Sequence, residues 1–301
     1  MSSHSYILNA KNEDIFINVN GELVHRRNAK ISVFDSGFLL GDGIWEGIRL
    51  HKSKLIFIDE HLDRLYASAK GISLDIHFSK NELIEEINKV LSKNNMEDDI
   101  HIRLIVSRGD KITPYQNPNA NVGPINYVII PEYKKTSPNT YIDGISIGRV
   151  PNIRPNDKIL SPHYNTLSKL NCILASIEAN KLGYDEGIMN DINGFISTCN
   201  STNLFFIKNK KVLTSTGKYC LNGITRSKAI SVCLNNQIDC TESNFTFENI
   251  KQCEEAFVTG TFAGIIPVSS LEGRELESTK YDSMTNRIRD LYNKEIQKYI
   301  G

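Results

Sequence analysis

The sequence has no excess of charge of either sign. Its 301 residues contain 35 lysines and arginines against 35 aspartates and glutamates, which gives a formal net charge of zero. Proteins that bind nucleic acids or acidic membranes through their overall charge carry a clear positive excess. The composition therefore argues against both partners, and we expect neither a nucleic-acid nor a membrane partner.

Long apolar runs and paired cysteines are also missing. No stretch approaches about 18 uninterrupted apolar residues, and the first sixteen residues contain no apolar run of signal-peptide length. The six cysteines form no C-x-x-C pair, no histidine cluster has zinc spacing, and six are too few for a disulfide scaffold at this length. We therefore expect a cytoplasmic protein with reduced thiols and no resident metal ion.

The composition, 40% hydrophobic and 23% charged, is that of an ordinary globular protein. The length of 301 residues allows two domains. The polar, proline-bearing stretch at 132–140 (EYKKTSPNT) is typical of a linker. We expect two α/β or α+β domains, over 1–132 and 141–301, joined by a linker at 133–140.

The first half predicts short strands with helices between them. Asn20-Gly21 predicts a tight turn between strands at 15–19 and 22–25. Further β-rich runs lie at 43–50, 54–58, 100–107 and 125–131. Helical periodicity appears at 60–70 and 80–93.

The second half predicts a strand at 144–150 and a helix over about 166–182, with leucines and isoleucines on one face. Hairpin-like strands follow at 187–197 and 203–214. A helix begins after Gly223, a strand covers 256–259, and a last amphipathic helix covers about 280–299.

Three elements of the sequence suit an anion. The helix start at Gly223-Ile224-Thr225 offers unpaired N–H groups and a hydroxyl, and the turn Thr259-Gly260-Thr261 offers another hydroxyl. Arg49 adds a cation on a strand of the first half. Taken singly, each is a weak signal, and the helix start alone is more typical of a plain helix N-terminus than of a phosphate site.

Five segments together strongly resemble the class IV aminotransferase family, which includes branched-chain aminotransferases, D-amino-acid aminotransferases and aminodeoxychorismate lyases. They are LLGDGIWEGIRL (39–50), DEHLDRLYASAKGI (59–72), IHIRLIVSRGD (100–110), GITR (223–226) and FVTGTFAGIIPV (257–268). The resemblance implies fold type IV, with a small N-terminal and a larger C-terminal α/β domain. It also implies pyridoxal phosphate in the cleft between the domains, and a homodimer.

The resemblance also assigns roles to single residues. Arg49, Ile224, Thr225 and Thr261 match the family's phosphate-binding positions. Arg103 and Arg108 stand where family members have arginines in the segment HIRLIVSRG, and either would contact the substrate or stabilise the structure near the cleft.

Four positions depart from the family pattern, all of them on the reacting side. The position of the Schiff-base lysine is Asn165, and that of the glutamate that pairs with the pyridine nitrogen is Thr198. Leu40 stands in place of a tyrosine and Gly264 in place of a second glutamate. An amide can form no internal aldimine and has no titratable nitrogen near neutral pH. A threonine cannot keep the pyridine nitrogen charged. Ordinary transamination is therefore not expected.

Two residues near Asn165 are candidates for replacement chemistry. Lys169 would lie one helical turn further on, facing the same cleft, or would be a solvated lysine on a helix face. His163 would share the side of Asn165 if the segment is extended, with Tyr164 facing away, or would be a structural histidine.

Three interpretations stay open. The protein is an enzyme that has abandoned the cofactor for acid–base, condensation or lyase chemistry on a small anionic molecule. Alternatively it still uses pyridoxal phosphate, with Lys169 in place of the lost lysine, or it is an inactive homologue that only binds. The fold constrains the site but does not decide the reaction.

Overall fold

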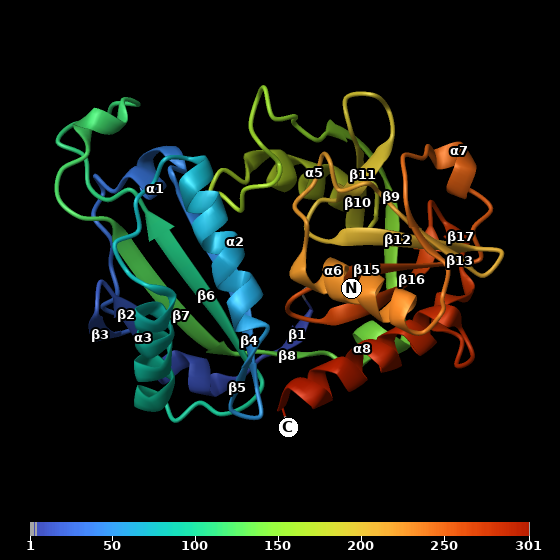
Figure 1. Cartoon of the computed structure of the whole chain (residues 1–301), viewed down its shortest axis with the longest axis horizontal. Helices are drawn as coiled ribbons and strands as arrows, with labels where there is room; N and C mark the ends of the chain where they lie inside the picture. Colours follow the sequence, from blue (N-terminus) through green and yellow to red (C-terminus); the bar gives the residue numbers. More distant parts are fainter. Residues whose placement is uncertain (1–2, 4, 301) are drawn as a thin grey trace. The chain divides into compact units, whose positions relative to one another are not determined.

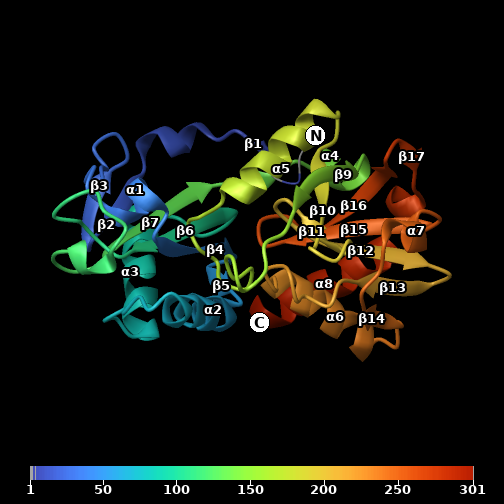
Figure 2. The ribbon, with the colours of Figure 1, turned by 90° about the horizontal axis from the view of Figure 1, so that it is seen from above.

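The computed structural model describes residue 3 and residues 5–300. They form two compact units (Figures 1 and 2). The N-terminal unit comprises Ile7–Lys135 together with the returning segment Tyr164–Lys169. Of the described residues, the C-terminal unit comprises Ser3, Ser5 and Tyr6, then Thr136–His163 and the residues from Leu170 to Ile300. Among the described residues, no helix combines the length and the apolar character that a membrane span requires.

The N-terminal unit is built on one six-stranded antiparallel sheet in the order β3-β2-β7-β6-β4-β5. Its strands are β2 (Phe16–Val19), β3 (Glu22–His25), β4 (Gly43–His51), β5 (Lys54–Ile56), β6 (Ile100–Ser107) and β7 (Asn126–Tyr133). Its helices are α1 (Ser36–Leu40), α2 (Ile58–Gly71) and α3 (Lys80–Lys93), with short 3₁₀ turns at Ala10–Asp14 and Pro118–Ala120. Short strands β1 (Tyr6–Ile7) and β8 (Lys135–Thr136) lie where the chain passes between the units.

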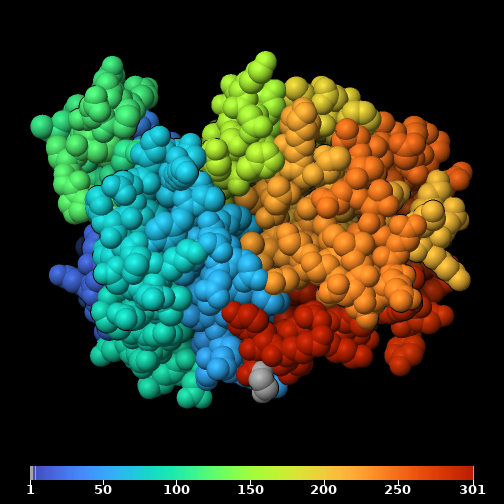
Figure 3. Space-filling model, in the orientation of Figure 1, coloured from blue at the N-terminus to red at the C-terminus, as the bar shows by residue number. Residues whose placement is uncertain are grey.

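Local sequence explains most of these elements. Asn20 and Gly21 both have positive φ, 54° and 92°, as the predicted tight turn between β2 and β3 requires. Ser79 and Glu82 form a reciprocal capping box at the start of α3. Helices α2 and α3 lie on the same face of the sheet (Figures 1 and 2), and their atoms cover that side of the unit (Figure 3). Their buried leucines and isoleucines pack with the sheet in one hydrophobic core.

Strand β4 divides its side chains between two environments because successive residues point to opposite faces. Ile44, Glu46 and Ile48 are fully buried on the face that α2 packs against. Trp45 and Arg49 are half-buried and belong to the opposite, open face. The strand therefore carries Glu46 on its core face and the candidate site residues Trp45 and Arg49 on its open face.

The C-terminal unit contains a nine-stranded mixed sheet in the order β11-β10-β9-β16-β15-β12-β13-β14, with β17 paired to β16. Its strands are β9 (Ile145–Ile153), β10 (Glu186–Asn190), β11 (Ile196–Cys199), β12 (Asn203–Lys208), β13 (Lys211–Thr214), β14 (Cys240–Glu242), β15 (Glu255–Gly260), β16 (Gly264–Leu271) and β17 (Arg274–Glu275). Its helices are α4 (Asn139–Ile142), α5 (Leu170–Lys181), α6 (Ile224–Asn235), α7 (Phe247–Ile250) and α8 (Met284–Ile300), with a 3₁₀ turn at Glu277–Thr279. Residues 133–140 include β8 and the start of α4.

The predicted helix at 166–182 is wrong at its beginning. Residues 165–167 run beside β4 instead, because Trp45 N–H donates to Asn165 O (2.9 Å) and Leu167 N–H donates to Gly43 O (2.9 Å). Helix α5 begins only at Leu170. Its expected apolar face is not buried either. Leu170 is 66% exposed and Ile173 52% exposed, whereas Ala175 and Ala179 face the core.

A charged cluster is buried beneath β4. Both carboxylate oxygens of Glu46 accept from Arg64 (2.8 and 2.7 Å), and one also contacts His61 Nδ1 at 2.7 Å. Glu46 and His61 are almost fully buried. Burial by itself would raise the pKa of Glu46, but the charge and hydrogen bonds of Arg64 and His61 outweigh it and hold that pKa below its ordinary value.

Removing this charge should destabilise the protein strongly at neutral pH. We expect Glu46→Gln to lower the free energy of unfolding by about 3 kcal/mol, because Arg64 would lose its buried counter-charge. A lowered carboxyl pKa stabilises the fold above about pH 4 and loses that effect as pH falls through the folded-state pKa. Urea unfolding from pH 7 to pH 3 should therefore show the difference from the native protein shrinking in acid. The exposed Glu85→Gln is the matched control, and an equal loss in both variants would contradict the prediction.

Candidate functional site

Asn165 is held in place at both ends of its side-chain amide. Its Nδ2 donates to the carbonyl oxygen of Trp45 (2.7 Å), and its Oδ1 accepts from Lys169 Nζ (3.0 Å). Its backbone N–H donates to Ser68 Oγ (3.1 Å), and the residue is 2% exposed. The amide therefore serves as a bridge between β4 and the Lys169 amine. Lys169 thus contacts Asn165, although the two residues are not on one helix as the spacing predicted.

Two cationic side chains lie over the indole ring of Trp45. The Arg103 guanidinium carbon lies 3.9 Å from the centre of the Trp45 ring, and Lys169 Nζ lies 5.5 Å from it. Arg103 is opposite Gly47 in the β4–β6 register. We call Trp45, Arg103, Asn165 and Lys169 the Trp45 cluster. It lies entirely within the N-terminal unit.

The Arg103 guanidinium is available to a ligand. Within the described residues it makes no hydrogen bond, and the Arg103 side chain is exposed on the open face of the sheet, with its guanidinium over the Trp45 ring. Partial burial lowers the pKa of Arg103, and the charge of Glu132 partly opposes this shift. A guanidinium with unused donors in such a position suits a carboxylate or phosphate, which it can bind through two parallel hydrogen bonds.

A pocket of about 660 Å³ lies on the open face of the same sheet. Its apolar lining comes from β2, β6 and β7 and includes Ile17, Ile105 and Val128. Its charged lining consists of the cations Arg26, Lys30, Arg103 and Lys134, together with His101, against the carboxylates Asp35 and Glu132. Burial lowers the pKa of Lys134. The charge of Glu132 opposes this shift, and the charge of Arg103 adds to it. The pocket therefore suits a small molecule with an anionic group and an apolar body.

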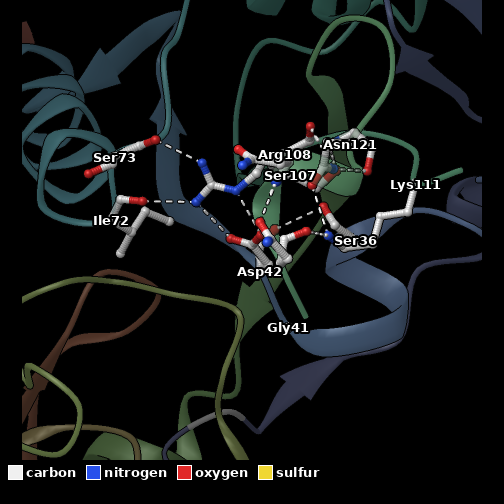
Figure 4. A network of polar contacts seen from close by, with 12 residues as sticks. Ser36, Gly41, Asp42, Ile72, Ser73, Ser107, Arg108, Lys111 and Asn121 are labelled. Carbon is white, nitrogen blue, oxygen red and sulfur yellow. Dashed lines mark hydrogen bonds and ion pairs between the residues drawn. The ribbon is translucent and has the colours of Figure 1, made fainter. Parts of the chain in front are cut away.

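Arg108 has a structural role. Its guanidinium binds both oxygens of Asp42 (2.7 and 3.0 Å) and the carbonyl oxygens of Ile72 and Ser73 (2.8 and 2.7 Å), as Figure 4 shows. Asp42 follows Gly41, the left-handed residue that ends α1. The network thereby fixes the entry into β4. Leu40, the last residue of α1, is 42% exposed.

In the C-terminal unit, the start of α6 lies at a polar corner. Helix α6 has Gly223 as its N-cap with no side-chain cap, so its first N–H groups are not used by a capping side chain. The Gly223 N–H itself donates to Asn203 Oδ1 (3.2 Å). A side chain at Gly223 would place its Cβ 2.4 Å from that oxygen. Asn203 therefore requires glycine at this helix start.

Asn203 also connects the helix start to the end of β15, because it is opposite Thr259 in the β12–β15 register. The Thr259 hydroxyl is buried and has no hydrogen-bond partner in the described part of the chain. Thr261 follows two residues later and is half-buried, and Thr225 is buried in the first turn of α6. The unit thus gathers Ile224, Thr225 and the Thr259–Thr261 turn at one corner, as an anion would require.

The Thr198 hydroxyl already donates a hydrogen bond to a backbone carbonyl of its own unit. Its Oγ1 donates to Thr202 O (2.6 Å), and the Thr202 hydroxyl donates to the buried carboxylate of Glu186 (2.6 Å). The neighbouring Cys199 is buried, and burial raises its pKa well above the ordinary value, so it is not an activated nucleophile. Gly264 has φ 70°, a conformation that a glutamate adopts only under strain.

The remaining predicted residues have separate environments. Arg49 lies half-buried on the open face of β4, opposite Ile56 and His101 in register. His163 Nε2 lies 4.0 Å from Asp157 Oδ2 in the C-terminal unit. Tyr164 packs against Gly71 of α2, where an added Cβ would be 2.2 Å from the ring.

Residues 43–271 match the family model of the amino-transferase class IV proteins. The chain is 36% identical over 280 residues to the branched-chain-amino-acid aminotransferase-like protein 2 of Arabidopsis thaliana, covering 92% of this chain but only 49% of that protein. The chain thus spans about half the length of this relative. It is 34% identical over 278 residues to a putative branched-chain-amino-acid aminotransferase of Methanocaldococcus jannaschii, covering 92% and 94% of the two chains.

The fold agrees with these matches. The branched-chain aminotransferase of the thermophilic archaeon Thermoproteus uzoniensis, solved with norvaline, matches with a TM-score of 0.83 and 25% identity over 95% of each chain. The predicted mixed α/β architecture of fold type IV is confirmed. The chain belongs to the class IV aminotransferase family.

Pyridoxal phosphate needs a place for its phosphate and an amine for its aldehyde. The uncapped start of α6 and the unpartnered Thr259 hydroxyl fit a phosphate group. Asn165 does not fit the second requirement, because its amide is neutral and hydrogen-bonded at both ends. The primary amine closest to it in the Trp45 cluster is that of Lys169.

A side chain at Gly223 should disturb the corner. We expect Gly223→Ala to lower the free energy of unfolding by about 1–3 kcal/mol, because the new Cβ must displace the Asn203 amide. Gly260→Ala is the control, since its nearest new contact is Thr202 Cγ2 at 3.7 Å. Equal stability of the two variants would show that the predicted clash is absent.

Proposed function

We propose that the protein is an enzyme that acts on a small anionic molecule by acid–base, condensation or lyase chemistry rather than by ordinary transamination. The observation that carries the proposal is the Trp45 cluster. It combines a cation with unused hydrogen-bond donors, Arg103, and a primary amine oriented by an amide, Lys169. Together they offer an anchor for an anionic group and a group that can transfer a proton.

Lys169 is the proposed general base. The Asn165 carbonyl oxygen fixes one hydrogen-bond direction of its Nζ at 3.0 Å, and the Trp45 ring lies beside it. A fixed amine can take a proton from a carbon next to a carbonyl group of the substrate. A lysine amine is one of the groups that enzymes use as a base or a nucleophile. Asn165 acts through Lys169 and is a positioning residue.

Arg103 is the proposed anchor. Its position at both the Trp45 ring and the pocket supports binding of a substrate carboxylate or phosphate there, with the apolar body over β6 and β7. His163 and Leu40 remain secondary candidates, for proton transfer and for substrate contact respectively. Ile224, Thr225, Thr198 and Thr261 of the C-terminal unit are proposed to contact a phosphate-bearing ligand. Arg49 of the N-terminal unit is proposed to contact an anionic group. We also propose that the protein acts as a homodimer, which light scattering would test.

A second candidate function retains pyridoxal phosphate, with Lys169 in place of the missing amine at position 165. The 3.0 Å contact between Lys169 Nζ and Asn165 Oδ1 favours it, because the amine reaches the tip of the residue-165 side chain. When bound, pyridoxal phosphate would supply an electron sink. Lys169 would hold its aldehyde.

Absorbance and peptide mapping separate the two candidates. Under the first proposal, the purified protein is colourless and stays colourless with added pyridoxal phosphate. Borohydride treatment followed by digestion then labels no lysine. A yellow protein in which borohydride fixes the cofactor on Lys169 would overturn the first proposal in favour of the second. The variant Asn165→Lys, treated in the same way, is the positive control for an amine at that position.

Proton transfer can be tested without knowing the substrate. Incubation with panels of amino and keto acids in D₂O, followed by NMR, should reveal exchange of a carbon-bound proton. We expect Lys169→Met to reduce the exchange rate by about 10²–10⁴-fold. Lys218→Met is the matched control, because Lys218 is an exposed lysine that also lies over an aromatic ring. Ligand-induced thermal stabilisation without exchange would instead identify a binding homologue.

Arg103 should act mainly on substrate binding. We expect Arg103→Met to raise KM by at least about tenfold, because a charge-assisted hydrogen bond is worth about 1.5–3 kcal/mol. Arg103→Lys should recover only part of this loss, since an ammonium group cannot form the paired hydrogen bonds of a guanidinium. Exchange rates measured against substrate concentration give both constants. An unchanged KM would remove Arg103 from the site.

A further inference from the structure

Two cysteines meet at the far end of α6. Cys233 lies in the last turn of the helix and Cys240 begins β14, and both are free thiols. The chain reverses between them, because the Ile238 N–H returns to Cys233 O (2.9 Å) and Gln237 adopts φ 57°. Cys240 is then fixed against the sheet, opposite Val212 of β13.

The reversal brings the two side chains into contact. The Cys233 and Cys240 thiols share a hydrogen bond. Cys233 is fully buried, whereas Cys240 is partly exposed. The hydrogen bond from Cys233 lowers the pKa of Cys240, and the same bond together with burial raises the pKa of Cys233. Arg226 favours the Cys240 thiolate, whereas burial, Glu242 and Asp239 oppose it.

The other thiols lack this arrangement. Cys199, Cys220 and Cys253 are buried, and burial raises the pKa of each. Cys172 is partly exposed and accepts a hydrogen bond from Arg154 Nη1 (3.0 Å). Among the described cysteines, a partly exposed thiol therefore contacts a buried one only at positions 240 and 233.

We propose that Cys233 and Cys240 are a redox modification site that closes to a reversible disulfide with hydrogen peroxide. The Cys240 thiolate attacks one peroxide oxygen, which breaks the O–O bond, releases hydroxide and forms a sulfenic acid. The Cys233 sulfur then displaces the hydroxyl as water and forms the S–S bond. Two thiols are oxidised to one disulfide while one peroxide is reduced to two waters. A dithiol reductant reverses the change.

The bridge would fasten α6 to β14 at a second point. The two elements are already joined near the start of the helix, where Arg226 Nη2 binds Glu242 Oε2 (2.6 Å) and Ser215 O (2.6 Å). A disulfide at the other end would restrict the unfolded chain, because it closes a short loop. The oxidised protein should therefore unfold a few degrees higher than the reduced protein.

Digestion of the native chain gives a direct test. Trypsin releases residues 229–251, which contain both cysteines. After peroxide treatment and alkylation of the remaining thiols, this peptide should lose the mass of two hydrogens and carry no alkyl group. Cleavage before Asp239 should leave its two halves linked until dithiothreitol is added. Cys172→Ser is the matched control and should still form the bridge.

Two results would overturn the proposal. The first is a sulfinic or sulfonic acid on Cys240 with Cys233 still open to alkylation. The second is the absence of any bridge at peroxide concentrations that oxidise Cys172. Cys240→Ser should form no bridge, retain its fold and show no oxidation-dependent shift in thermal unfolding. If Cys233→Ser fails to fold, Cys240→Ser alone decides the outcome, because its side chain is partly exposed.

Discussion

The hydrogen bonds between residues 165–167 and β4 are the constraint on which the Trp45 cluster depends. They bind a segment distant in sequence to the edge of the N-terminal sheet, and they place the Asn165 amide against the carbonyl of Trp45. Lys169 and Arg103 then meet at one indole ring. On the opposite face, Glu46, His61 and Arg64 fasten the same strand to α2. Strand β4 therefore carries the buried charged cluster on one face and the Trp45 ring of the candidate site on the other.

In the C-terminal unit, the buried side-chain amide of Asn203 links strand β15 to the start of α6. Asn203 faces Thr259 in the sheet and accepts from the backbone of Gly223, so it sets the distance between β15 and the start of α6. Phosphate-binding corners need this kind of fixed backbone, because N–H groups and hydroxyls bind an anion well only when they converge. Arg226 is a buried residue in the first turn of α6, and its ion pair with Glu242 joins the helix to β14.

Sequence periodicity predicted the strands and helices whose signals are local, such as β6, α3 and the Asn20–Gly21 turn. It failed at residues 166–169, because an apolar pattern does not distinguish a helix from a segment that pairs with a distant strand. The family resemblance selected Asn165 and Arg103, and the spacing of four residues from Asn165 selected Lys169. The roles of Trp45, Asn203 and Thr259 depend on partners far along the chain, which no single-sequence signal reveals.

Trp45 is the sole tryptophan of the chain, and it contacts both cations of its cluster. Its indole Nε1 is buried and has no hydrogen-bond partner among the described residues. The emission of this indole must respond to whatever displaces, neutralises or reorients Arg103 and Lys169. The protein therefore contains its own optical reporter at the candidate site, free of background from other indoles. Binding of an unknown ligand can be followed by this emission alone, with neither a label nor a coupled assay.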